Sequence, residues 1–365
     1  MASISPIVNI SRQVQIPNFA FAFDIDGVLL RSHDPLPRAR KALSYLQRQR
    51  IPFILLTNGG GKHESERVAD LSESLGVPLD TSMFVQSHTP FADMDQYKDE
   101  TVLVCGGEGD KCRVVAEKYG YKSVVTPGDI LVQHPEVWPF SAHLMSLYKP
   151  FARPLPRPIH PTDPSSSLKI DAIFIYNDPR DWGLDATLIL DLLLSSAGVL
   201  GTISPKNDTP SLPNRGFQQD SQPPLYFSNP DLWEALEGLW GAVTGGERMG
   251  VKLNKTVIGK PFRETFEFAE KKLIGCREEI FKETVAEGRL EPLRRVYMVG
   301  DNPESDIRGG NTYQSPHGTD WCSILVKTGV HQEGQEPTWK PRVIVEDVYD
   351  AVQWAVEQSK WDSRD

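Results

Sequence analysis

The chain has 365 residues, 39% of them hydrophobic and 24% charged, which is typical of a globular protein with about two domains of roughly 150 residues. Its formal net charge of −10 at pH 7 argues against a nucleic-acid groove or an anionic membrane surface as the main partner. The sequence has no apolar run long enough to span a bilayer.

The cysteines and the N-terminal segment bear on the compartment. The four cysteines lie far apart and form no CxxC pair, which argues against a disulfide framework or a zinc knuckle and favours a reducing, intracellular compartment. Residues 1–18 contain no acid and a single base, Arg12. We interpret them as an N-terminal tail, with a remnant of a mitochondrial presequence as the alternative, so the compartment is cytoplasmic or mitochondrial.

The first third of the chain alternates strands with helices. Residues 21–25 (FAFDI) form an apolar run, and residues 51–58 (IPFILLTN) form another, of the kind buried on both faces of a parallel sheet. Residues 37–50 and 64–76 have apolar side chains at helical spacing, and Gly76 ends the second helix. This order predicts the start of a doubly wound, Rossmann-like parallel sheet.

A second α/β unit begins near residue 100. The pattern predicts strands at 101–107 and 122–126 on either side of a helix at 109–120. Residues 134–168 are rich in proline and end in a serine run, so we expect a long irregular loop there.

The remaining elements return to strand and helix patterns. A strand is predicted at 169–178 and a helix at 184–198, where Asp185, Asp191 and two adjacent serines mark the more solvated face. After a second polar, proline-rich stretch at 204–224, the pattern predicts helices at 230–243 and 263–273 and strands at 295–302 and 322–329. The simplest topology is a core of residues 19–90 and 226–365 interrupted by an α/β cap of residues 91–225.

Two acids follow the first strand directly. If the strand continued through them, Asp24 and Asp26 would point to the same side, and two like charges would repel each other there. A bound cation, or chemistry at the end of the strand, explains such a pair better than folding does. Gly27 then allows the backbone to turn sharply.

Three further groups of polar residues are predicted to meet these acids, because open α/β sheets bind ligands at the carboxyl ends of their strands. They are Thr57 and Asn58 at the end of FILLTN, Lys260 in VIGKP, and Asp301 with Asp306 in GDNPESDI. Together they offer carboxylates for a hard cation such as Mg²⁺, donors for phosphoryl oxygens and one positive charge.

These four groups resemble the four motifs of the haloacid dehalogenase (HAD) superfamily, in the order found in its phosphatases. The insertion resembles the large α/β cap of class IIA, the NagD-like and nitrophenylphosphatase-like proteins. The segments NDPRDWG (177–183) and FSNPDLW (227–233) are most similar to the cat-eye-syndrome-critical-region-protein-5-like branch. The resemblance covers about residues 18–350 and implies a HAD core with an inserted cap, a small phosphorylated metabolite as substrate and a homodimer through the cap.

The resemblance also implies a role for each residue. Asp24 is the nucleophile that forms an aspartyl-phosphate, and Asp26 is the general acid and base. Asp24, Asp301 and the backbone carbonyl of Asp26 hold Mg²⁺. The phosphoryl group is bound by Thr57, Asn58 and Lys260. The ligands are oriented by Asp306 and Asn302. The candidate cap contacts to substrate are Asp181 and Trp182.

Two alternatives stay open. A dehalogenase also uses an aspartate nucleophile, but it has no need of an acid two residues later, so Asp26 favours phosphoryl transfer. A catalytically weak scaffold would use the fold, and the proline-rich cap loop, for protein contacts. The complete set of mutually repelling acids argues against a scaffold, because folding alone gives no reason to keep it.

Overall fold

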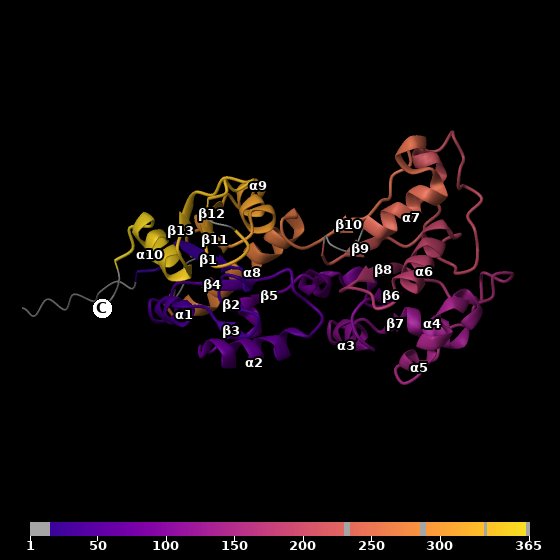
Figure 1. Cartoon of the computed structure of the whole chain (residues 1–365), viewed down its shortest axis with the longest axis horizontal. Coiled ribbons are helices and arrows are strands. Elements are labelled where there is room, and N and C mark those ends of the chain that lie inside the picture. The colour runs from indigo at the N-terminus through magenta and orange to yellow at the C-terminus, as the bar shows by residue number, and fades with distance from the viewer. Residues whose placement is uncertain (1–14, 230–233, 285–289, 332–333, 363–365) are drawn as a thin grey trace, which may run out of the picture.

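The computed structural model describes residues 15–229, 234–284, 290–331 and 334–362. Figure 1 shows two lobes, each built on a parallel sheet of its own and joined by a narrow waist. The lobe that contains the first and the last of the described residues is the core, and the other lobe is the cap. The predicted α/β architecture, a Rossmann-like core with an inserted α/β cap, is confirmed.

The core sheet, within the described residues, has six parallel strands in the order β13-β12-β11-β1-β4-β5. They are β1 (Phe19–Phe23), β4 (Phe53–Leu56), β5 (Phe84–Val85), β11 (Arg295–Gly300), β12 (Asp320–Val326) and β13 (Val343–Val345). The helices of this lobe are α1 (Ala39–Arg48), α2 (Glu64–Leu75), α8 (Arg263–Phe281), α9 (Arg308–Thr312) and α10 (Val348–Gln358). A short hairpin of β2 (Leu30–Arg31) and β3 (Asp34–Pro35) follows β1.

Strand β1 lies at the centre of the core sheet because all five of its residues are apolar and buried. It pairs with β4 on one side and with β11 on the other, so it joins the two halves of the sequence. Its phenylalanines, including Phe21, pack in the cluster formed with α1 and α10, whereas Ala20 and Ala22 face the cluster that contains α8. The alternation of large and small side chains thus builds a sheet covered by helices on both faces.

The cap sheet has the order β10-β9-β8-β6-β7, again all parallel. Its strands are β6 (Thr101–Cys105), β7 (Ser123–Val125), β8 (Ala172–Ile175), β9 (Leu225–Phe227) and β10 (Thr256–Val257). Its helices are α3 (Lys111–Lys118), α4 (Pro127–Gln133), α5 (Met145–Tyr148), α6 (Trp182–Leu194) and α7 (Glu234–Thr244). No helix in the described ranges is both long and apolar enough to cross a membrane.

The predicted end of the cap at residue 225 is wrong, because β9, α7 and β10 all belong to the cap lobe. On α7, Trp240 is buried and packs edge-on against Phe217 at 5.7 Å between ring centroids. The core therefore resumes after Val257 and not at residue 226. Periodicity cannot reveal this, because strands of two or three residues carry almost no pattern and an apolar helix face packs equally well on either sheet.

The proline-rich segment 134–168 is more ordered than we expected. It contains two short 3₁₀ helices, Pro135–Val137 and Pro139–Leu144, followed directly by α5. Proline at the first position of a helical turn has no N–H to leave unpaired, so these prolines start short turns as well as interrupting longer ones.

The prediction that Asp185 lies on a solvated face of α6 is also wrong. Asp185 is only 5% exposed and lines a cap cavity of about 590 Å³, whose walls include Leu147, Tyr148 and Phe151. Burial, with a smaller contribution from the neighbouring Asp181, raises the pKa of Asp185 to about 8. Helix α6 is apolar on most sides, so its sequence gives a weak indication of which face is wet.

Replacing Asp185 with asparagine should make the protein more stable at neutral pH. The pKa of Asp185 is raised from 3.8 to about 8 on folding, so its contribution to stability is complete below pH 3.8 and is lost as the pH rises towards 8. Asparagine carries no such penalty. The advantage of Asp185→Asn in free energy of unfolding should therefore grow by about 2–3 kcal/mol between pH 5 and pH 7. Urea unfolding of both proteins at the two pH values measures this, and a difference that does not change with pH would contradict it.

Candidate active site

Asp24 occupies the carboxyl end of β1. The strand ends at Phe23, and the backbone N–H of Asp24 still donates to the carbonyl of Val299 at 2.9 Å. Its side chain is buried, whereas that of Asp26 is exposed. The strand does not continue through both acids, so alternation along a strand does not place them on one side. Asp26 lies in the turn that follows, beside the hairpin of β2 and β3.

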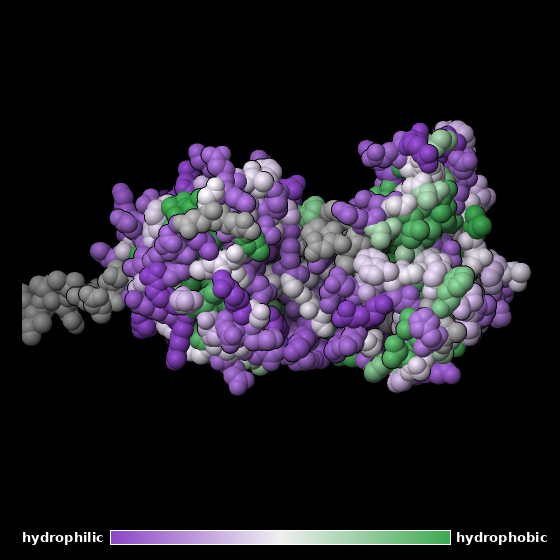
Figure 2. All heavy atoms as spheres, viewed as in Figure 1, coloured by the Kyte–Doolittle hydropathy of each residue, from purple (hydrophilic) through white to green (hydrophobic). Residues whose placement is uncertain are grey.

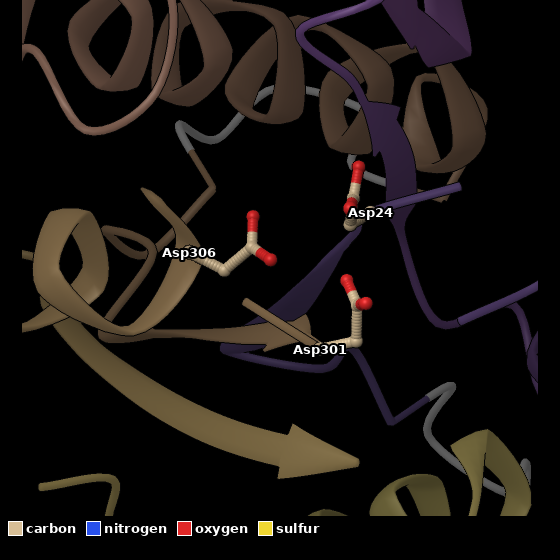
Figure 3. Close-up of side chains that lie close together, drawn as sticks. All are labelled: Asp24, Asp301 and Asp306. Atoms are coloured by element: carbon tan, nitrogen blue, oxygen red, sulfur yellow. The ribbon is translucent and has the colours of Figure 1, made fainter. Parts of the chain in front are cut away.

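Asp301 and Asp306 reach the same place from β11. Asp301 follows the last residue of that strand, and a single π-helical turn, Pro303–Ile307, carries Asp306 back over it. The backbone N–H of Val330 donates to Oδ2 of Asp301 at 2.7 Å, and that of Asn302 donates to Oδ2 of Asp306 at 3.1 Å. Figure 3 shows the carboxylates of Asp24, Asp301 and Asp306 close together, the first two just beyond core strands and the third on the turn after β11.

Lys260 bridges two of these acids. It lies three residues after β10, on the segment that returns from the cap to the core. Its Nζ is 2.7 Å from Oδ1 of Asp24 and 2.7 Å from Oδ1 of Asp306, and the side chain is only 1% exposed. A buried ammonium between two buried carboxylates is fixed in position, because each group would be costly to bury alone.

Burial dominates the electrostatics of the cluster. It raises the pKa of Asp24 and of Asp301, and raises that of Asp306 to about 6, while Lys260 opposes the rise at all three. Burial opposes the charge of Lys260, but Asp24 and Asp306 raise its pKa above the ordinary value. If all three acids are ionised, the single ammonium leaves an excess of two negative charges in a buried space. A divalent cation would remove that excess.

The spacing of the three acids suits a site for a divalent cation, in which Asp24 and Asp301 are the candidate ligands and Asp306 stays paired with Lys260. One carboxylate oxygen from each lies within 4.8 Å of the others. Oxygens on opposite sides of Mg²⁺ are about 4.2 Å apart, so a small closure of the cluster satisfies an octahedral shell. Within the described part of the chain, no other group of acids, histidines or cysteines meets this geometric test.

The loop between β4 and α2, residues 57–63, supplies the next side chains. Thr57 is buried, and its Oγ1 accepts a hydrogen bond from the N–H of Gly59 at 3.0 Å. The amide of Asn58 is paired with the backbone of Lys260, donating to its carbonyl at 2.9 Å and accepting from its N–H at 2.7 Å. Asn58 thus positions Lys260, a role that we did not expect. Its contact to a phosphoryl group stays a prediction.

The segment after β12 was missed by the sequence analysis. Besides the N–H of Val330, this segment contributes Gly329, where an added Cβ would lie 1.8 Å from Oδ2 of Asp301. Gly27, with a φ of +82°, is also close, because an added Cβ there would lie 2.4 Å from the same oxygen. Thr328 ties the two turns together by donating to the carbonyl of Gly27 at 2.6 Å. The only sequence signal is the sequence KTG at the end of an apolar strand.

For the other predicted site residues, Asn302, Asp181 and Trp182, the structure shows their surroundings in the protein but no contact to a substrate. The side chain of Asn302 caps the π-helical turn by accepting from the N–H of Glu304 at 2.9 Å. Asp181 caps α6 by accepting from the N–H of Leu184 at 3.1 Å, and Trp182 is 39% exposed. Their contacts to a substrate stay predictions. The segment FSNPDLW ends in residues 230–233, which lie outside the described residues.

Comparison with known proteins bears on the fold and the family of the chain. The family model described as haloacid dehalogenase-like hydrolase matches residues 21–122, and a second, HAD-hydrolase-like, matches residues 257–351. A solved structure of p-nitrophenyl phosphatase from Archaeoglobus fulgidus has the same fold, with a TM-score of 0.56, 14% identity, and coverage of 93% of this chain and all of that one.

Two fungal proteins are similar over almost the whole chain. A Schizosaccharomyces pombe fusion of cardiolipin synthase with a mitochondrial hydrolase is 38% identical over 95% of this chain, which spans 55% of the fusion's length. A mitochondrial hydrolase of Saccharomyces cerevisiae is 35% identical over 95% of this chain and 97% of its own. The chain therefore belongs to the haloacid dehalogenase-like hydrolase family.

Proposed function

We propose that this hydrolase is a Mg²⁺-dependent phosphatase of class IIA that acts on a small phosphorylated metabolite. The observation that carries the proposal is the contact between buried Asp24 and buried Lys260, at 2.7 Å within a cluster of three acids. This places a carboxylate oxygen next to a fixed positive charge, which is what attack on a phosphoryl group requires.

The proposed reaction has two steps. An Asp24 oxygen attacks phosphorus while Asp26 gives a proton to the leaving oxygen, and this forms an aspartyl-phosphate. Water then attacks the phosphorus and gives its proton to Asp26, which releases phosphate and restores both acids. The exposure of Asp26 suits this role, because it must exchange protons with a leaving group and with water. Lys260 and Thr57 face the developing charge.

Asp24, Asp301 and the backbone carbonyl of Asp26 would hold Mg²⁺. Asp306 would orient the site from behind, through its contacts to Lys260 and Asn302. The ion would supply positive charge to the phosphoryl oxygens.

Features of the cap argue for a small substrate and for a dimer. The cap would roof the site and exclude bulky protein substrates. Large apolar side chains at the surface of the described residues gather mainly on the cap, where Leu239 and Val243 of α7 are 43% and 56% exposed (Figure 2). We infer a homodimer through the cap. Light scattering would show a monomer if this is wrong.

The relatives support a mitochondrial location for the protein, because both fungal proteins are named mitochondrial hydrolases. The acid-free residues 1–18, with Arg12, suit a presequence. Microscopy of the full chain with a C-terminal fluorescent tag tests this, and a uniform cytoplasmic signal would contradict it.

Phosphate release from p-nitrophenyl phosphate and from a panel of phosphorylated metabolites tests the proposed activity. Chelation should abolish turnover, and Mg²⁺ should restore it. Ca²⁺ should inhibit, because its larger and looser shell displaces Asp24 from the line of attack. Full turnover in chelator would refute the metal assignment, and the absence of any phosphate release with Mg²⁺ would refute the phosphatase.

A further inference from the structure

The β4–α2 loop touches both segments that join core and cap. On the returning side, Asn58 holds the backbone of Lys260, as described above. On the outgoing side, the N–H of Ser87 donates to the carbonyl of Gly59 at 3.3 Å. Next to Ser87, Nε2 of His88 accepts a hydrogen bond from the N–H of Gly61 at 3.2 Å.

His88 continues this contact into the cap. Its Nδ1 lies 2.9 Å from the hydroxyl of Tyr119, which follows α3, and that hydroxyl donates to Oε1 of Glu64 on α2. Since Gly61 N–H can only donate, Nε2 of His88 must accept, so Nδ1 carries the proton and donates to Tyr119. The bonds therefore run in one direction, from Gly61 through His88 and Tyr119 to Glu64. They start in the core, cross to the cap and return to the core.

The chain of bonds is closed off from water at its centre. His88 is 0% exposed, and the ring of Tyr176, at the end of β8, packs 5.2 Å from it. Burial lowers the pKa of His88 to about 4, which keeps the ring neutral at pH 7 and suits an acceptor at Nε2. The fit is tight at the loop, because a Cβ added to Gly60 would lie 2.9 Å from the His88 ring.

We infer that His88 is a positioning residue that sets the conformation of the β4–α2 loop and links it to the position of the cap through Tyr119. The loop carries Thr57 and Asn58, so the inference rests on the proposed function for its effect on catalysis. The link makes the geometry around Lys260 and Thr57 depend on where the cap lies. Binding of a leaving group under the cap would thereby order the loop that contacts the phosphoryl group.

Three substitutions separate the contact of His88 with the loop, at Gly61, from its contact with the cap, at Tyr119. His88→Gln places an amide oxygen near the former Nε2, so it can accept from Gly61 but cannot reach Tyr119. His88→Asn places its amide near the former Nδ1, so it can donate to Tyr119 but cannot accept from Gly61. Tyr119→Phe removes the cap contact and leaves His88 on the loop. Tyr226→Phe is the matched control, because among the described residues its hydroxyl bonds to Tyr97 alone, 2.9 Å away within the cap.

Hydrogen–deuterium exchange of the full-length protein tests the link without reference to activity. The Gly61 amide should exchange about five- to tenfold faster in His88→Asn, as the loss of one hydrogen bond implies, and at the wild-type rate in His88→Gln. The inference would be overturned if the Gly61 amide exchanged at the wild-type rate in both variants, or if its exchange were accelerated equally in both. Hydrogen exchange can be measured even if the wild-type protein releases no phosphate. A failure of the proposed function can therefore be told apart from a failure of this inference.

Kinetics with Mg²⁺ then test the consequence for the site. His88→Asn should lower kcat for p-nitrophenyl phosphate and weaken inhibition by orthovanadate, each about five- to tenfold. Tyr119→Phe and His88→Gln should keep that kcat and instead raise KM for metabolites that contact the cap. Tyr226→Phe should change neither. If all the His88 and Tyr119 variants only lower the melting temperature, with kcat, KM and vanadate inhibition unchanged, His88 has a structural role and the inference is wrong.

Discussion

Replacing Lys260 with methionine is expected to lower kcat about a thousandfold while the overall fold survives. The ammonium lies 2.7 Å from Oδ1 of Asp24, the proposed nucleophile, so in the proposed reaction its charge acts where the transition state accumulates negative charge. Removing one preorganised electrostatic contact of this kind costs about 10²–10³ in rate, and the full charge of lysine places the effect at the upper end. Steady-state kinetics with p-nitrophenyl phosphate, together with circular dichroism, measure rate and fold separately.

The position of Lys260 adds a stability effect that needs a control. Methionine leaves Asp24 and Asp306 buried without a counter-charge, which should lower the free energy of unfolding by about 3–5 kcal/mol. The double variant Lys260→Met with Asp306→Asn removes one of the two stranded charges, so it should recover part of the stability and none of the rate. Lys282→Met, on an exposed pair with Glu279, should change neither. An unchanged kcat in Lys260→Met would leave Lys260 a purely structural role.

Replacing Asp26 with asparagine should affect alkyl and aryl phosphates very differently. In the proposed reaction, Asp26 protonates the leaving oxygen in the first step and accepts a proton from water in the second. An alkoxide leaves poorly without that proton, so turnover of a sugar or glycerol phosphate should fall by about 10²–10⁴ at the first step. A nitrophenolate leaves readily, so p-nitrophenyl phosphate should give one burst of phenolate and then stall with phosphate held on Asp24.

Rapid-quench kinetics and intact-protein mass measurement read out the burst and the trapped phosphoenzyme. Asp24→Asn lacks the nucleophile and should show no burst with either substrate. Equal slowing of both substrates by Asp26→Asn, with no phosphoenzyme, would remove Asp26 from the acid–base role and leave it a residue of the metal site.

Two acids of the cluster, Asp24 and Asp301, could be predicted because each directly follows a largely apolar strand. Asp24 follows FAFAF, and Asp301 follows VYMVG. Parallel strands end at one edge of a sheet, which predicts that the two acids share that edge, and the pairing of β1 with β11 makes them neighbours. Lys260 could be placed only through the family resemblance, since the two-residue strand before it carries no usable pattern.

Other parts of the site could not be predicted, for identifiable physical reasons. The contact from Val330 to Asp301 uses a backbone N–H, which any residue would supply. Asn58 has a donor and an acceptor on one amide, and the sequence cannot say that both are used on Lys260. Asp185 is buried because α5 and α6 enclose a cavity, which depends on how several elements pack. In each case the contact depends on how distant segments pack in the tertiary structure, which the local sequence does not specify.

The pairing of β1 with β11 has a consequence for how the chain folds during synthesis. Phe19 is paired with Arg295, whereas the whole cap sheet lies between them in one continuous stretch. A ribosome adds about 5–20 residues per second, so β11 is synthesised roughly 15–55 seconds after β1. Every strand of the cap is synthesised before β11. During that interval one edge of an entirely apolar strand is unpaired, and such an edge is open to aggregation. Nascent chains stalled before residue 295 should accordingly hold a folded cap and an incomplete core that needs a chaperone, and pulse proteolysis of such stalled chains would show whether the cap alone is protected.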